Sequence, residues 1–183
     1  MRNLTLCLFM GICILLISCK PGDTPNPTPE KKKEYTLTFI STEIVDFKEI
    51  TADKTIRNID KAKAGDYFKE RMEFATPTQL QFKNDSLYMI KPEGLVEKHK
   101  IQWKNGELYL HNPHTETWKY CGKEMGNGQF MLNTAFFSVT SKTNARFLHY
   151  AGQDHSFKSH ADLKTEANAS TIWLQTHTLF GQK

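Results

Sequence analysis

The chain has 183 residues and four cysteines, with 24 Lys and Arg against 20 Asp and Glu. This near balance of charge, with no stripe of basic residues and interleaved aromatics along the sequence, argues against nucleic acid as a partner. The part of the chain beyond residue 34 is long enough for one domain with its own hydrophobic core. The sequence therefore predicts a single folded domain, and it does not name a ligand or a reaction.

The first 18 residues, MRNLTLCLFMGICILLIS, carry one charge, Arg2, before an apolar run that ends at Ile17. This run has the length of a signal peptide and is shorter than the ~20 apolar residues of a membrane-spanning helix. It ends in L-I-S-C (16–19), which resembles the lipobox of bacterial lipoproteins. The resemblance implies that residues 1–18 are a lipoprotein signal peptide and that lipid, including palmitate, is attached to Cys19. An uncleaved anchor or an ordinary secretory signal is the alternative interpretation.

Residues 19–34 are predicted to be a tether that begins with the lipidated Cys19. Its four prolines favour an extended chain without core-forming side chains. Lys20 follows Cys19 where lipoproteins retained in the inner membrane carry Asp, so we expect a location in the outer membrane, on its periplasmic or surface face. The lipid on Cys19 makes the membrane the first expected partner.

From Tyr35 onward, apolar and polar residues alternate with a period of two, which is typical of strands with one buried face. Turn residues separate these runs, and Asn105-Gly106 is the strongest hairpin signal among them. The predicted strands, in chain order, are 35–39, 80–82, 86–90, 99–103, 107–111, 117–121, 129–133, 136–140, 146–150 and 171–180.

Two segments depart from this alternation. Residues 53–72 roughly follow a helical period and predict one or two short helices that could cover a barrel mouth, with an extra strand over 68–75 as the competing interpretation. Residues 151–169 are polar and predict a loop with one short helical turn.

Short connections between consecutive strands indicate antiparallel neighbours, and a long meander removes its edges by closing into a barrel. The stretches LQFKNDSLYMI (80–90), HKIQWKNGELYLH (99–111) and ETWKYCG (116–122), with the signal and the tether, resemble the lipocalin-like lipoproteins of Bacteroidetes. The resemblance implies that residues 35–183 form an all-β, antiparallel up-and-down meander that closes into a lipocalin-like barrel with one or two short helices and an apolar cavity. The Gly-x-Trp motif of lipocalins is absent from the first strand, so the resemblance extends to architecture only.

A barrel of about eight strands is just wide enough to hold side chains or one small ligand. We expect Phe82, Phe130 and several other aromatic residues to face the interior, where ordinary core packing is the alternative to ligand contact. Arg146 or His149 would supply a polar anchor for a mainly apolar ligand. The predicted ligand-binding residues are Trp103, Trp118, Tyr120, Arg146, Phe147, His149 and Trp173.

Motifs for catalysis, cofactors and metals are missing from the sequence. It has no G-x-S-x-G and no glycine-rich phosphate loop, so we expect no enzyme, no catalytic residue and no cofactor. Cys121 is expected to be a small buried hydrophobe. The histidine pairs lack the spacing of a third metal ligand, and no metal is expected. These pairs are His111 with His114, and His155 with His160 near Asp154 and Asp162.

Two functions from different classes remain open. In the first, the outer-membrane lipoprotein binds a small, mainly apolar ligand in its barrel cavity. In the second, the core is filled and the domain is an interaction module for an envelope protein or glycan. A cavity or a filled interior discriminates between the two.

Overall fold

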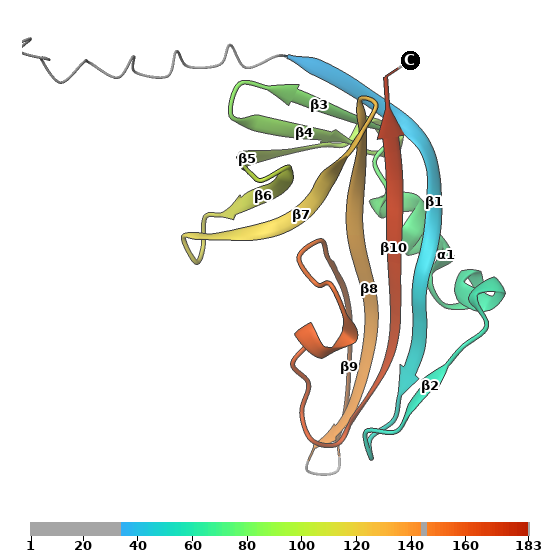
Figure 1. The fold of residues 1–183 in the computed structure, drawn as a ribbon. Coiled ribbons are helices and arrows are strands. Elements are labelled where there is room, and N and C mark those ends of the chain that lie inside the picture. The colour runs from blue at the N-terminus through green and yellow to red at the C-terminus, as the bar shows by residue number, and fades with distance from the viewer. Residues whose placement is uncertain (1–33, 144–145, 183) are drawn as a thin grey trace, which may run out of the picture. The chain divides into compact units, whose positions relative to one another are not determined.

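The computed structural model describes residues 34–143 and 146–182, and the predicted signal peptide, Cys19 and nearly all of the tether lie outside them. Within these residues the chain is almost entirely β-structure, with one α-helix (Figure 1). The strands are β1 (Tyr35–Ile50), β2 (Ile56–Asn58), β3 (Gln79–Lys83), β4 (Ser86–Ile90), β5 (Val96–Lys104), β6 (Glu107–Asn112), β7 (Thr117–Gly126), β8 (Gln129–Thr143), β9 (Arg146–Asp154) and β10 (Ala169–Gly181). The helical elements are the α-helix α1 (Ala64–Ala75) and the 3₁₀ turns η1 (Lys61–Lys63), η2 (Pro92–Gly94) and η3 (His160–Asp162).

Eight strands close into an antiparallel barrel in the order β1-β3-β4-β5-β6-β7-β8-β10, and the predicted all-β, lipocalin-like barrel is confirmed. Closure depends on β10, which pairs with residues 130–141 of β8 on one edge and with residues 38–50 of β1 on the other. The side chains of β10 face the barrel core on one side and the loop between β9 and β10 on the other, so most of β10 is buried. β2 and β9 extend the sheet beyond the barrel, beside the long strands β1 and β8.

β8 changes its partner part-way along its length. Residues 129–132 pair with β7, and residues 135–143 pair with β9 on the same edge. The two ladders leave a gap at Asn133 and Thr134, where β7 bends away from β8 (Figure 1). The predicted separate strands 129–133 and 136–140 are therefore wrong, because no glycine or proline interrupts the run and both of its faces are covered.

The segment 53–72 holds η1 and most of α1, as its period predicted, although β2 takes its first part. Pro77 follows the end of α1, where a proline commonly stands because it cannot continue a helix. Phe68 of α1 packs against Phe47 of β1 and Phe136 of β8, with ring centroids 6.5 and 6.2 Å apart. The helix thus covers one face of the long strands, and the competing strand over 68–75 is wrong.

The hairpin turns follow the sequence closely. Asn105 and Gly106 join β5 to β6 with φ angles of 53° and 76°. Positive φ at both central residues is what a type I′ turn requires, and Asn-Gly adopts it at low cost. The predicted hairpin at this position is confirmed.

The core prediction can be tested at Phe130, which is 1% exposed and contacts Phe82 across the barrel with ring centroids 5.8 Å apart. Phe130→Ala should lower the free energy of unfolding by about 3–5 kcal/mol, because it deletes a buried ring from a packed core. Urea denaturation followed by tryptophan fluorescence measures this loss. Phe147→Ala is the matched control, since Phe147 is 72% exposed and its removal should change stability by less than about 0.5 kcal/mol. Equal losses in the two variants would contradict the assigned core.

Candidate functional site

The apolar end of the barrel interior is filled by aromatic rings. Trp103 of β5 lies 5.8 Å from the ring of Phe82 on β3 and 5.9 Å from that of Phe130 on β8, and Phe82 also stacks on Tyr35. Gly122 of β7 makes room for this packing, because a Cβ there would lie 2.6 Å from Cζ of Phe130. Since the three strands are not neighbours, rings in contact across the barrel leave no space for a ligand at this level.

A polar layer follows inside the barrel. Lys91 is 3% exposed, and its ammonium lies 2.6 Å from the Glu97 carboxylate. Nε2 of His99, on the same inward face of β5, lies 3.7 Å from the other carboxylate oxygen of Glu97. Buried lysines are almost always paired, and Glu97 is the partner of Lys91 inside the barrel.

The gap in the β8 ladders is closed by side chains. The Asn133 amide donates to the carbonyls of His155 and Phe157 at 2.6 and 2.8 Å, and its oxygen accepts from Gln175 at 2.9 Å. His155 Nδ1 donates to the Asn133 carbonyl at 2.9 Å. Asn133 thereby replaces the missing strand partner and holds the loop between β9 and β10 against the long strands.

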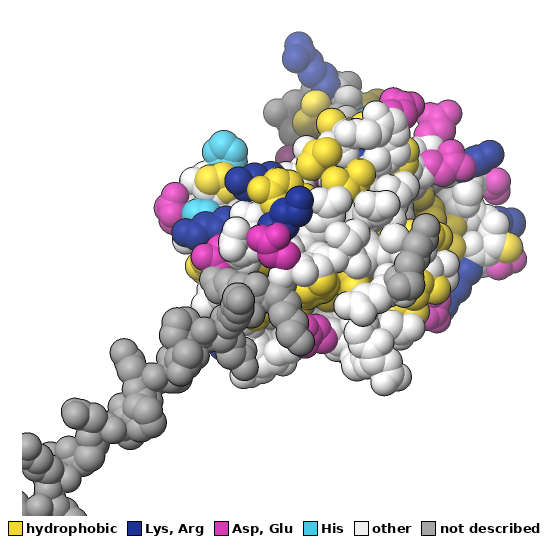
Figure 2. All heavy atoms as spheres, turned by 90° about the horizontal axis from the view of Figure 1, so that it is seen from above, with side chains coloured by type: hydrophobic (Ala, Val, Ile, Leu, Met, Phe, Trp, Pro, Cys, Tyr) yellow, Lys and Arg dark blue, Asp and Glu magenta, His cyan; other side chains and the backbone are white. Residues whose placement is uncertain are grey.

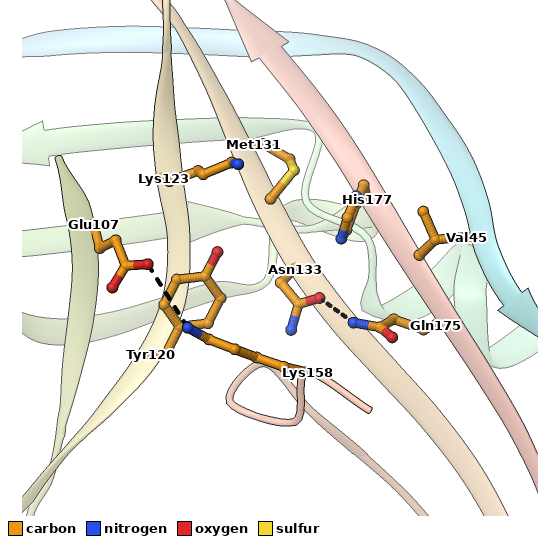
Figure 3. Close-up of a pocket in the computed structure, with 9 residues that line it drawn as sticks. All are labelled: Val45, Glu107, Tyr120, Lys123, Met131, Asn133, Lys158, Gln175 and His177. Carbon is orange, nitrogen blue, oxygen red and sulfur yellow. Dashed lines mark hydrogen bonds and ion pairs between the residues drawn. The ribbon is translucent and has the colours of Figure 1, made fainter. Parts of the chain in front are cut away.

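Beside this gap in the β8 ladders, an open groove lies on the outer face of the barrel, with a volume of about 330 Å³. Figure 3 shows its lining side chains, which come from β1, β6, β7, β8, β10 and the loop after β9. The size is at the lower limit for small-ligand sites, but the lining is mostly polar. The lining residues are Val45, Glu107, Tyr120, Lys123, Met131, Asn133, Lys158, Gln175 and His177.

The electrostatics of this outer groove are dominated by cations. The Lys158 ammonium lies 4.0 Å from the centre of the Tyr120 ring and 3.7 Å from the Glu107 carboxylate. Burial, and then the Glu107 charge, raises the pKa of Tyr120 to about 12, so its hydroxyl stays a hydrogen-bond donor. Lys123 and His177 point into the groove from other sides (Figure 3). Burial lowers the pKa of His177, so the charged groups that line the groove are one carboxylate, Glu107, and two lysines.

A second polar surface lies on the outer face of β4, β5 and β7, and we call it the lysine–aromatic face. Lys83 and Lys98 lie 5.7 and 5.5 Å from the centre of the Tyr88 ring, and Lys100 lies 6.0 Å from that of Trp118. Figure 2 shows Lys or Arg side chains beside hydrophobic ones, with Asp or Glu side chains among them, on the left of the molecule, the side where Figure 1 places β4 to β6. This face was not predicted from the sequence, although lysines two apart on the polar side of β5 were a signal for it.

The structure does not bring the seven predicted ligand-binding residues together. Trp103 closes the apolar end of the barrel and is 37% exposed, whereas Trp173 is fully buried and stacks on Phe157 of the loop after β9. Trp118 and Tyr120 lie on the outer face of β7, in the lysine–aromatic face and the outer groove. The expected interior position is therefore wrong for these two residues and for Trp173. The strands β7 and β10 each carry large side chains on the outer face of the barrel as well as on its inner face.

The remaining three residues of that prediction lie on β9, beyond the barrel wall. Phe147 is 72% exposed, and Arg146 is also exposed. His149 Nε2 lies 2.9 Å from the Ser138 hydroxyl on the neighbouring strand. None of the three reaches the barrel interior, so an apolar ligand inside the barrel could not use them as anchors.

The histidine pairs have separate roles. His111 pairs with Glu116 at 3.2 Å on the surface, while His155 points into the gap beside Thr134. Among residues 34–143 and 146–182, no three His, Cys, Asp or Glu side chains converge as metal ligands. Cys121 is fully buried, as expected, and burial raises the pKa of its thiol far above the usual range.

Comparisons of the chain with protein-family models, with curated proteins and with solved structures found no match. In the part of the chain that the structure describes, no helix has the length and apolar character needed to cross a bilayer. The site must therefore be interpreted from its own geometry.

The polar layer predicts a stability that depends on pH. Burial lowers the pKa of His155 and of His99 below their ordinary value, so the folded chain holds both rings neutral. The unfolded chain takes up these protons as the pH falls through about 6.5, and the free energy of unfolding should therefore fall between pH 7.5 and 5.5. Urea denaturation across this range measures the slope.

His155→Gln should make that slope shallower, because one of the two buried rings no longer titrates, while the exposed His114→Gln control should keep it. The interval lies above the titration of the carboxylates, so they contribute little to it. Identical slopes for the unsubstituted chain and His155→Gln would show that His155 is not held neutral in the folded state.

Proposed function

We propose that this protein is an outer-membrane lipoprotein, anchored by the lipid on Cys19, whose barrel domain binds an envelope partner through its outer face. Binding on the outer face is supported by the cluster of Phe82, Trp103 and Phe130, whose rings meet across the barrel interior. The outer groove offers polar groups instead, because Lys123, His177 and Tyr120 line it. The proposal is for a binding protein and not an enzyme.

The interior supports this choice at each level. Beside the aromatic cluster lies the polar layer of Lys91, Glu97 and His99, which would have to give up the ion pair of Lys91 with Glu97 to admit an apolar molecule. Further along the long strands β1 and β8, Phe68 of α1 packs against them. An apolar ligand would therefore have to displace packed rings or desolvate charges, and a partner on the outside would do neither.

The anchor is tested by replacing its acceptor. Cys19→Ala should abolish incorporation of radiolabelled palmitate and release the chain from the outer-membrane fraction, because no other exposed thiol follows the signal. Cys121→Ala is the control, and it should keep both the label and the membrane location. Full labelling of Cys19→Ala would refute the lipoprotein proposal.

The binding mode is tested with the mature chain carrying Cys19→Ala, immobilised and washed with an envelope extract separated into lipid-soluble and water-soluble fractions. We expect retention of a water-soluble component, reduced at least about fivefold by Trp118→Ala, which removes a 38%-exposed ring from the outer face. Phe147→Ala is the matched control. Retention of a lipid that Trp118→Ala leaves unchanged would favour the interior ligand.

A further inference from the structure

We propose that the partner of the outer face is an acidic polysaccharide, bound along the lysine–aromatic face and into the outer groove. This inference rests on the proposed function and names the chemical class of its ligand. It combines three observations: alternating cations and rings, an excess of positive charge, and continuity between the two surfaces.

The alternation arises from strand register. Tyr88 of β4 is the direct cross-strand partner of Lys98 on β5, and Lys83 of β3 lies 5.7 Å from the centre of the same ring. Lys100, two residues beyond Lys98 and thus on the same face, reaches the Trp118 ring on β7. Each lysine therefore stands beside an aromatic ring that is partly open to solvent.

This arrangement suits a polymer of charged sugars. The flat apolar face of a sugar ring packs on an aromatic side chain, and the neighbouring ammonium reaches the carboxylate on the same sugar. Lysines held over rings by cation–π contacts lose less freedom when they bind. A neutral glycan would use the rings and leave the lysines without a role.

The charges of this outer surface complement a polyanion. On the lysine–aromatic face the cations are Lys83, Lys98 and Lys100, and Glu116, in the turn before β7, is paired with His111. In the outer groove, Glu107 accepts from Tyr109 at 2.5 Å and faces Lys158, so its charge is already partly neutralised. The lysines of the two surfaces would attract carboxylates over several ångströms.

The face and the groove are continuous along β7. Trp118 belongs to the face and Tyr120, two residues further, lines the groove, so both rings project from the same side of the strand. Their cross-strand partners on β6 are His111 and Tyr109, which are also polar and aromatic. A linear chain could therefore run across β4 to β7 and end in the groove beside Lys123 and Lys158.

Single-stranded nucleic acid uses the same elements, a cationic track with rings for stacking. The proposed lipid anchor would hold the protein in the cell envelope. The polymer it meets there is polysaccharide and not single-stranded nucleic acid. Nucleic acid is therefore an outcome of the test and not the proposal.

The test is affinity electrophoresis of the mature chain carrying Cys19→Ala, in gels that contain polygalacturonate, its methyl-esterified form or single-stranded DNA. We expect retardation by polygalacturonate, at least about tenfold stronger than by the neutral ester, and weaker retardation by DNA. The double variant Lys98→Gln/Lys100→Gln should weaken binding about fivefold, and Trp118→Ala by a similar factor.

Matched controls separate the face from general charge. Lys61→Gln/Lys69→Gln removes the same charge from exposed positions on η1 and α1, and Phe147→Ala removes an exposed ring elsewhere. Equal losses in the control and test pairs, or stronger retardation by DNA, would overturn the proposal. Binding of an envelope component that depends on Trp118, without retardation by polygalacturonate, would overturn this inference and leave the proposed function standing.

Discussion

The change of partner along β8 is the constraint on which the rest of the structure depends. β8 and β10 pair along residues 130–141, but the other edge of β8 is shared between β7 and β9. The backbone at Asn133 would lose its partner at this point, and its side chain restores the connection by binding the carbonyls of His155 and Phe157. The Asn133 amide therefore holds the loop after β9 against β8. It also closes the gap that remains on this edge of β8 where β7 bends away.

The bend of β7 separates the inside of the barrel from the outer surface that we propose binds a partner. Inside, strands brought close together bury their rings and leave a narrow interior filled with apolar and then polar side chains. Outside, the corner between β7 and β8 becomes the outer groove, and the curved wall from β4 to β7 presents the lysine–aromatic face. In a small barrel whose interior is filled by side chains, the outer wall is the surface left for the proposed partner.

Much of the fold could be predicted from the sequence, because strands with one buried face alternate with a period of two and Asn105-Gly106 fixes a hairpin. β8 and β10 were harder, since burial of both faces removes the alternation, and the break placed between residues 133 and 136 does not exist. The site could not be predicted from composition. Lys158 meets Tyr120, and Lys100 meets Trp118, only because strand register and a loop anchored by Asn133 bring them together.

We infer that the barrel interior is filled by its own side chains. Native mass spectrometry can test this on the mature chain carrying Cys19→Ala, purified under mild conditions and then incubated with an envelope lipid extract. We expect the mass of the polypeptide alone before and after incubation, because the rings of Phe82, Trp103 and Phe130 occupy the apolar end of the interior. A discrete lipid mass that leaves only on denaturation would contradict it.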